Sequence, residues 1–251
     1  MLTFVGLGLY DKRSITVEGR EALRDADRVF AEFYTSRLVG TTIEELETHH
    51  GVAIDVRDRA GVEQEPAPVL DAAEAGSAVF LVAGDPMVST THTDLRLRAH
   101  ERDIETRIIH GTTAQTAAGS LTGLQNYRFG KATTIPFAYR DRPIPESVVE
   151  TIEANRERGL HTLCYLDIKA AEGRYMSADV AAARLAPEID GLGVVVARAG
   201  SPDPLVVADR LSALAEGAFG DPLHLLVLPG ELHHLERDAL EALADAPPEL
   251  L

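Results

Sequence analysis

The feature that most constrains the fold is a regular alternation of short apolar segments and amphipathic segments along the whole chain. The short segments are rich in Val, Ile and Leu, and several end in Gly or Pro, as buried strands do. The expected strands are Leu2–Val5, Arg28–Phe33, Val52–Val56, Ala78–Val82, Glu105–Ile109, Thr133–Pro136, Thr162–Leu166, Gly193–Ala197 and His224–Leu228. Strands that alternate with helices indicate an α/β fold with much parallel pairing.

Helical periodicity lies between these strands. The expected helices are Val17–Asp25, Ile43–Thr48, Ala67–Ala75, Asp94–Asp103, Thr113–Thr122, Glu146–Arg158, Ala178–Leu185, Asp209–Glu216 and Leu235–Leu243. Thr42 and Glu45 have the spacing of a capping box, in which each side chain bonds a free backbone amide of the first helical turn.

Length and composition leave two domain arrangements open. A chain of 251 residues with 45% hydrophobic content suits one large domain or two small ones, because a single core usually stops growing at about 250–300 residues. The stretch Gly123–Pro145 is rich in Gly and Pro. We interpret it as the connection between two α/β halves, with room for one strand of its own. We place the boundary within residues 111–125, which predicts domains at 1–112 and 113–251.

The charge balance restricts the partners. The chain has 40 acidic and 24 basic residues, a net charge of −16, and only three of the basic residues are lysines. Surplus carboxylate keeps a protein in solution and repels nucleic acid, so we expect no nucleic-acid partner. Acid excess with little lysine is typical of a salt-loving cytoplasm, where salt at about 1 M shortens the Debye length to ~3 Å and screens self-repulsion. An ordinary acidic protein from a GC-rich genome is the alternative.

Cysteine usage and the first residues indicate the compartment. Cys164 is the only cysteine, so no intrachain disulfide can form, as in a reducing compartment, and we expect it in the core. The apolar start, Met1–Tyr10, lacks the basic region and cleavage site of a signal peptide. No apolar run approaches the ~20 residues that cross a bilayer. We therefore expect a cytoplasmic protein without a membrane partner.

Small or polar residues follow several expected strands, where ligands of open α/β sheets bind. Gly6-Leu7-Gly8 lacks the third glycine of a dinucleotide fingerprint, so a tight turn is the simpler interpretation. Gly84-Asp85-Pro86 presents a carboxylate that either holds an ammonium or a ribose, or caps the next segment. His110-Gly111-Thr112-Thr113 opens a helix with free amides, or merely caps it.

Further strand ends extend this pattern. Asp167 and Lys169 form either a surface pair or part of a cleft lining, and His224 is by default a histidine at a strand edge. Together the strand ends favour one shared ligand cleft. The nine histidines show no spacing typical of a metal site, and neither a Gly-x-Ser-x-Gly motif nor a P-loop occurs.

A set of longer blocks matches one known family over nearly the whole chain. The blocks are Phe4–Asp11, Ala31–Ser36, Gly84–Pro86 with Val88 and Thr90–His92, Thr122–Leu124, Phe129–Lys131, Leu166–Lys169, Ala197–Ser201 and Pro229–His233. With them the chain resembles the archaeal diphthine synthases. Glu32–Ser36 and Thr90–His92 are the more specific blocks, whereas Gly84–Pro86 is shared by the wider tetrapyrrole-methylase fold.

The resemblance implies a homodimer of two-domain α/β subunits, with S-adenosylmethionine in the cleft between the domains and S-adenosylhomocysteine as product. It implies N-methylation, up to trimethylation, of the 3-amino-3-carboxypropyl histidine of translation elongation factor two in diphthamide biosynthesis. By position, the cofactor contacts fall on Leu9, Asp85, Val88, Thr113, Ala114, Leu166, Ala199 and His224. Thr113-Ala114 departs from the family's usual Ser and β-branched residue, which keeps the hydroxyl and removes some apolar contact.

The chemistry of such a reaction leaves the base unassigned. The amine attacks only when it is neutral, whereas a free alkyl amine has a pKa near ~10.4. Asp85, Asp167 and Glu32 are the candidate bases, and none is assigned. The alternative functions are a precorrin or uroporphyrinogen methyltransferase of the same fold, a nucleotide-binding module without turnover, and a hydrolase, for which the chain lacks a recognisable nucleophile.

Overall fold

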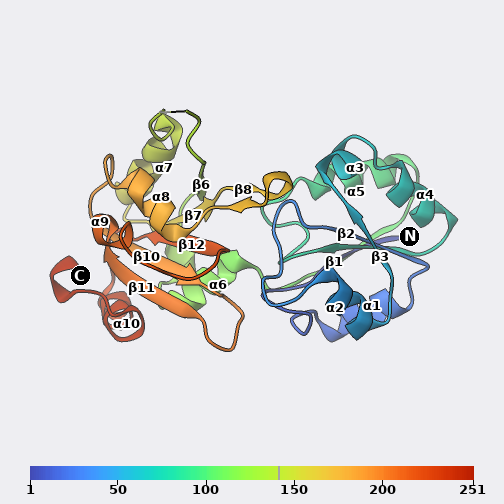
Figure 1. Ribbon diagram of the computed structural model, residues 1–251, viewed down its shortest axis with the longest axis horizontal. Helices are drawn as coiled ribbons and strands as arrows, with labels where there is room; N and C mark the ends of the chain where they lie inside the picture. The colour runs from blue at the N-terminus through green and yellow to red at the C-terminus, as the bar shows by residue number, and fades with distance from the viewer. Residues whose placement is uncertain (141) are drawn as a thin grey trace. The chain divides into compact units, whose positions relative to one another are not determined.

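The computed structural model describes residues 1–140 and 142–251, which form two compact units, Met1–Thr113 and Ala114–Leu251. Each unit has a five-stranded sheet with helices on both faces (Figure 1). Strands and helices alternate along the chain, which confirms the predicted α/β class. The division into domains at 1–112 and 113–251 remains a prediction.

The first unit is built on a parallel sheet in the order β3-β2-β4-β1-β5. Its strands are β1 (Leu2–Gly6), β2 (Arg28–Glu32), β3 (Ile54–Arg57), β4 (Ala78–Val82) and β5 (Thr106–Ile109). β1 lies between β4 and β5, with Leu2 opposite both Ala78 and Thr106. Because all five strands are parallel, their carboxyl ends share one edge, where ligands bind in such sheets.

Helices cover both faces of this sheet (Figure 1). One face carries α1 (Val17–Arg24) and α2 (Ile43–His50), and the other carries α3 (Arg59–Glu63), α4 (Ala67–Ala75) and α5 (His92–Glu101). Neighbouring residues of a strand point to opposite faces. Phe4 and Phe80 therefore belong to the core with α4 and α5, and Val5 and Leu81 to the core with α1 and α2.

The second unit has a mixed sheet in the order β11-β10-β12-β7-β6. Its strands are β6 (Thr133–Ile135), β7 (Thr162–Leu166), β10 (Leu192–Ala197), β11 (Leu205–Arg210) and β12 (His224–Leu228). The β6–β7 pair is parallel, whereas β10 is antiparallel to β11 and β12, and β12 is antiparallel to β7. The prediction of much parallel pairing is therefore right for the first sheet and wrong for the second. A short loop joins β10 to β11, and such a loop only permits the chain to reverse.

Helices again form two outer layers (Figure 1). One core contains residues of α7 (Glu146–Arg156), α8 (Ala178–Leu185) and α9 (Leu211–Leu214), and the other contains residues of α6 (Ala114–Thr122) and α10 (His234–Ala244). Cys164 is fully buried in the first of these cores, and burial raises the pKa of its thiol to about 12. The prediction that Cys164 is a core residue is confirmed.

Some expected elements need correction. The helix expected at Asp209–Glu216 is too long at both ends, because β11 runs to Arg210 and only Leu211–Leu214 is helical. β11 pairs with β10 at the edge of the sheet, and such pairing depends on long-range packing more than on local pattern. The short helix α3 and the hairpin of β8 (Ile168–Lys169) and β9 (Arg174–Tyr175) are also missing from the predicted elements.

The stretch Gly123–Pro145, expected as the connection between two halves, lies within the second unit. It contains a 3₁₀ turn at Asn126–Arg128 and the strand β6, and its residue Asp141 lies outside the described residues. The capping box is confirmed, since Thr42 Oγ1 accepts from Glu45 N at 3.2 Å and Glu45 Oε2 accepts from Thr42 N at 2.9 Å.

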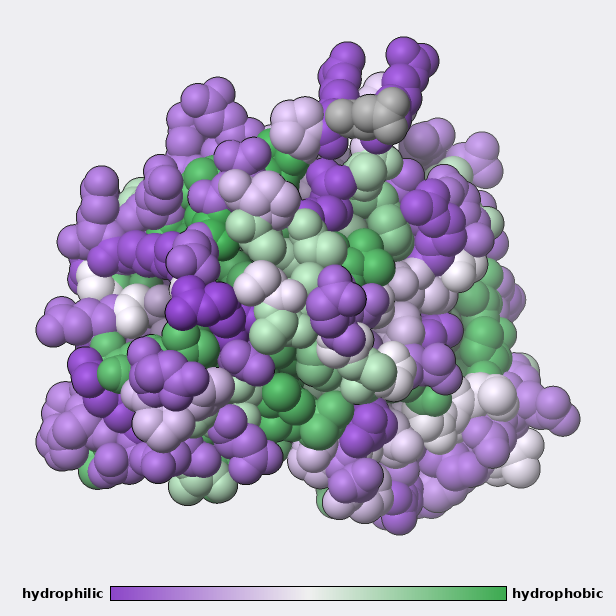
Figure 2. All heavy atoms as spheres, turned by 60° about the vertical axis from the view of Figure 1, so that its left-hand side comes forward, coloured by the Kyte–Doolittle hydropathy of each residue, from purple (hydrophilic) through white to green (hydrophobic). Residues whose placement is uncertain are grey.

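The hydrophilic character of the surface agrees with the 25% of charged residues in the chain. Figure 2 shows a face covered mostly by hydrophilic side chains, with apolar side chains between them. Among the described residues, none of the helices combines the length and the apolar character that a membrane span requires.

Candidate functional site

Glycines lie where three strands of the first sheet end, and there the backbones of the loops pack closely together. β1 ends at Gly6, and Gly84 and Gly111 lie just beyond β4 and β5. A Cβ atom on Gly6 would lie 2.5 Å from the Gly84 oxygen, and one on Gly111 would also overlap that oxygen. Only glycine fits at Gly6 and Gly111, so the backbones of these loops pack against each other without side chains between them.

Gly84 leaves space beside the backbone at this edge of the sheet. Its φ of +78° lies in the left-handed region that favours glycine. Two hydrogen bonds fix it against Gly8, from Gly84 N to Gly8 O at 2.8 Å and from Gly8 N to Gly84 O at 3.2 Å. A Cβ atom on Gly84 would meet only the Cα of Thr113, at 3.9 Å. The space beside Gly84 is therefore open, and a ligand can approach the backbone there.

Asp85 is held at this edge by both of its oxygens. The residue is 6% exposed, and its Oδ1 accepts a hydrogen bond from Met87 N at 2.9 Å. Its Oδ2 lies 2.7 Å from Nδ1 of His110, the first residue after β5, whose side chain is 75% exposed. Of the two interpretations from the sequence, the turn is present, since Oδ1 bonds the Met87 amide, and the binding of a ligand by this carboxylate stays a prediction. The sequence placed His110 in a motif at a strand end but gave its imidazole no role, and the contact with Asp85 appears only in the structure.

A buried network supports the loop that carries Asp85. Glu32, at the end of β2, is fully buried and accepts hydrogen bonds from Tyr34 N at 2.9 Å, Thr35 N at 3.0 Å and the Thr35 hydroxyl. His92 Nε2 lies 3.4 Å from Glu32 Oε1, and His92 Nδ1 lies 3.0 Å from the Pro86 oxygen. Glu32 was a candidate base, and its fully buried carboxylate accepts these hydrogen bonds and so supports the fold of the loop that follows β2.

The other expected contacts of the first unit flank the same glycines. Leu9 follows Gly8, and its carbonyl accepts hydrogen bonds from Asp11 N at 3.0 Å and from the Ser14 hydroxyl. Val88 is half-buried in the turn that Asp85 begins, and Thr113 lies beside Gly84. Leu9, Asp85, Val88 and Thr113 therefore lie on the loops that follow β1, β4 and β5.

Expected contacts of the second unit gather at one edge of its sheet. Leu166 ends β7, Ala199 follows β10, and His224 begins β12 opposite Ala197. Ala114 begins α6, directly after Thr113. His224 is buried, its Nδ1 accepts from Ala178 N at 3.1 Å, and its Nε2 lies 3.1 Å from the Asp221 oxygen. Burial lowers the pKa of His224, so its ring is neutral. Because both ring nitrogens already have partners within the protein, only the backbone of His224 can contact a ligand.

Asp167 and Lys169 lie at the same edge of the second sheet, and each contacts a different part of Phe137. Asp167 Oδ2 accepts a hydrogen bond from Phe137 N at 2.8 Å, and the ammonium of Lys169 lies 5.9 Å from the centre of the Phe137 ring. Asp167 therefore anchors the chain that leaves β6, and its carboxylate is only partly available as a base.

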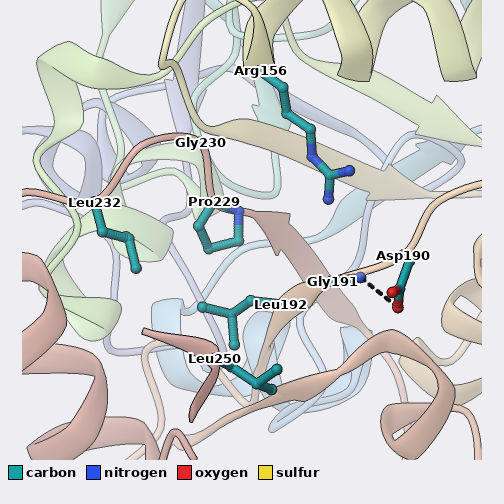
Figure 3. Close-up of a pocket in the computed structure, with 8 residues that line it drawn as sticks. All are labelled: Arg156, Asp190, Gly191, Leu192, Pro229, Gly230, Leu232 and Leu250. Atoms are coloured by element: carbon teal, nitrogen blue, oxygen red, sulfur yellow. Dashed lines mark hydrogen bonds between the residues drawn. The ribbon is translucent and has the colours of Figure 1, made fainter. Parts of the chain in front are cut away.

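A pocket of about 340 Å³ lies at the opposite edge of the second sheet (Figure 3). Asp190, Gly191 and Leu192 line it where β10 begins, and Pro229 and Gly230 line it where β12 ends. Arg156 and Leu250 complete the wall with Leu232. None of the site residues expected from the sequence lines this pocket.

Comparisons with known proteins show which family this chain is similar to. Residues 1–215 match the family described as Tetrapyrrole (Corrin/Porphyrin) Methylases. A protein of Natronomonas pharaonis named diphthine synthase is 68% identical over 100% of this chain and 98% of its own length, and one of Halorubrum lacusprofundi with the same name is 67% identical over 100% and 99%. A crystal structure described as diphthine synthase is 41% identical over 100% of this chain and 99% of its own, with a TM-score of 0.92.

Proposed function

We propose a function on the premise that this chain belongs to the diphthine synthase family of the tetrapyrrole methylases. It is a methyltransferase of diphthamide biosynthesis. Its methyl donor is S-adenosylmethionine, and its acceptor is the amino group of the 3-amino-3-carboxypropyl histidine of translation elongation factor two. The full-length similarity to proteins named diphthine synthase carries this proposal, and it favours this acceptor over the porphyrin-type acceptors of the same fold.

The edge of the first sheet fits such a cofactor. Gly84 leaves open space beside its backbone, and Asp85 places an acceptor-only carboxylate next to that space. A carboxylate binds an ammonium or a ribose hydroxyl, and S-adenosylmethionine carries both groups. We propose that Leu9, Asp85, Val88 and Thr113 hold it from the first unit, and Ala114, Leu166, Ala199 and His224 from the second. Because both ring nitrogens of His224 are occupied within the protein, that residue acts through its backbone.

The protein supplies position and electrostatics. When bound, the cofactor provides an electrophilic methyl group on its sulfonium. Loops fixed by backbone packing at Gly6, Gly84 and Gly111 hold their ligand contacts in place before binding. Such preorganisation converts a bimolecular encounter into an effectively unimolecular one.

The decisive experiment is mass spectrometry of the elongation factor after incubation with this protein and S-adenosylmethionine in high salt. The factor carries its 3-amino-3-carboxypropyl histidine, and the control is the same factor with an unmodified histidine. We expect the modified histidine to gain one, two or three methyl groups and the control to gain none. An unchanged modified factor, in the presence of demonstrated cofactor binding, would contradict the proposed acceptor.

We also propose that the protein forms a homodimer, as the family resemblance implies. Analytical ultracentrifugation in molar salt tests this, since the 27.1 kDa chain and its dimer sediment as distinct species.

A further inference from the structure

We infer that His110 accepts the proton that the substrate amine must lose before it attacks, and that Asp85 positions the imidazole for this step. The inference rests on the proposed function, because it presupposes an amine as the methyl acceptor. It assigns the base that the sequence left open, to a residue outside the three candidates.

The geometry joins a buried carboxylate to an exposed imidazole. Asp85 Oδ2 lies 2.7 Å from His110 Nδ1, and the side chains are 5% and 75% exposed. The two residues follow β4 and β5, which lie on either side of β1 in the parallel sheet. The imidazole therefore stands at the ligand-binding edge, open to an approaching substrate.

The carboxylate cannot turn away from the imidazole. Its Oδ1 accepts from Met87 N at 2.9 Å. The following residue, Pro86, is also held, because its carbonyl oxygen lies 3.0 Å from both the Thr90 hydroxyl and His92 Nδ1. His92 in turn lies against the fully buried Glu32. These contacts hold the loop in place, and they therefore also hold the direction of the Asp85 carboxylate.

This arrangement selects one tautomer of His110. A carboxylate accepts and does not donate, so Nδ1 must carry the proton that the hydrogen bond requires. Nε2 of a neutral ring then keeps its lone pair and can accept a second proton. The imidazolium that results is stabilised by the same carboxylate, which is the role an aspartate has when it orients a histidine base.

The substrate ammonium transfers one proton to His110 Nε2 and becomes a neutral amine. The amine's lone pair then forms the new N–C bond to the methyl group, while the S–C bond breaks and its electron pair stays on sulfur. His110 later releases the proton to solvent. In this tautomer His110 Nε2 keeps its lone pair, whereas both oxygens of Asp85 already take part in hydrogen bonds, so the imidazole is the proton acceptor of the pair.

The test compares His110→Asn with His100→Asn. Asparagine at position 110 can still donate to Asp85, but it cannot take up a proton, and His100 is an exposed histidine on α5 of the same unit. We expect His110→Asn to lower the single-turnover rate at saturating cofactor by about 10²–10⁴-fold, with an unchanged cofactor Kd by calorimetry. We expect His100→Asn to match the wild type. Imidazole in the buffer should restore part of the rate in His110→Ala.

A second readout needs no turnover. The ¹⁵N chemical shifts of His110 report its tautomer, and we expect Nδ1–H in the wild type. In Asp85→Asn, the amide can donate to Nδ1, so we expect the proton to move to Nε2 and the rate at saturating cofactor to fall although His110 is intact.

Each outcome has one meaning. If wild-type protein methylates the factor and His110→Asn does so at the same saturated rate, the role of His110 is wrong and the proposed function stands. If His110→Asn weakens cofactor binding and leaves the saturated rate intact, His110 is a binding residue and the inference is likewise wrong. If the wild type methylates no amine of the factor, the proposed function fails, and this inference fails with it.

Discussion

At the residue scale, Gly84 and Gly51 share a left-handed backbone conformation but have different roles. Their φ values are +78° and +71°, and an added Cβ atom would clash at neither, since it meets nothing at Gly51 and only the Thr113 Cα, at 3.9 Å, at Gly84. Gly51 ends α2, whereas Gly84 lies at the proposed cofactor edge. The backbone strain of an alanine should therefore be similar at both positions. A difference in cofactor affinity between the two alanine variants would then come from contact with the ligand.

We expect Gly84→Ala and Gly51→Ala to lower the free energy of unfolding by a similar amount, about 1–2 kcal/mol, the cost of a left-handed residue with a side chain. We expect only Gly84→Ala to weaken binding of S-adenosylmethionine, by about tenfold or more, which is ~1.4 kcal/mol. Urea unfolding and calorimetric titration measure the two quantities. Equal cofactor affinity in both variants would remove Gly84 from the proposed site.

At the scale of elements, a buried carboxylate joins several segments of the second unit. Glu236 in the first turn of α10 is fully buried and accepts from Gln125 N at 2.9 Å, His233 N at 2.8 Å and Arg128 at 3.2 Å. His161 Nε2 lies 2.9 Å from it. Burial raises the pKa of Glu236, but these hydrogen bonds outweigh it and bring the pKa below its ordinary value of 4.5.

We expect Glu236→Gln to lower the free energy of unfolding by about 2–3 kcal/mol at pH 7, because charge-assisted hydrogen bonds of a buried group are lost. Glu45→Gln is the matched control, since Glu45 is the exposed capping-box residue of α2 and glutamine also suits that position. We expect its effect to stay below about 0.5 kcal/mol. Urea unfolding measures both.

The same variant has a defined pH dependence. The folded pKa of Glu236 is lowered, so its stabilisation is present above pH 4.5 and is lost as the pH falls further and the carboxylate protonates. We therefore expect the gap between wild type and Glu236→Gln to shrink below about pH 4.5. A gap that stays constant down to pH 3 would show that the charge of Glu236 does not stabilise the fold.

At the scale of the whole molecule, the net charge of −16 sets the response to salt. Like charges on one chain repel, and the Debye length falls from about 10 Å at 0.1 M to about 3 Å at 1 M salt. The similarity to proteins of Natronomonas and Halorubrum agrees with the predicted halophilic archaeal origin.

We expect the midpoint of thermal unfolding to rise between 0.1 and 1 M KCl, by about 2–4 °C for each kcal/mol of repulsion that is screened. Choline chloride should give a similar rise, because screening depends on ionic strength and not on the kind of cation. A midpoint that does not change with either salt would show that the carboxylates repel each other too weakly to matter.

The sequence by itself determined the features that depend on local pattern. Apolar periodicity located the strands of both five-stranded sheets except β11, although it missed the separate hairpin β8–β9. The Thr42–Glu45 spacing located a helix start, and the apolar run around Cys164 placed that thiol in the core. The family blocks indicated the methyltransferase class. In each case residues a few positions apart carry the information, since a helix or strand repeats every few residues.

Only the tertiary structure decided which distant residues meet. Asp85 and His110 are 25 positions apart, and His161 and Glu236 are 75 apart, so no spacing rule connects them. The antiparallel order of the second sheet was decided in the same way, because strand direction depends on how the connections cross the sheet. Local periodicity specifies the elements, whereas the burial of their apolar faces against each other determines which strand ends, and therefore which side chains, share one site.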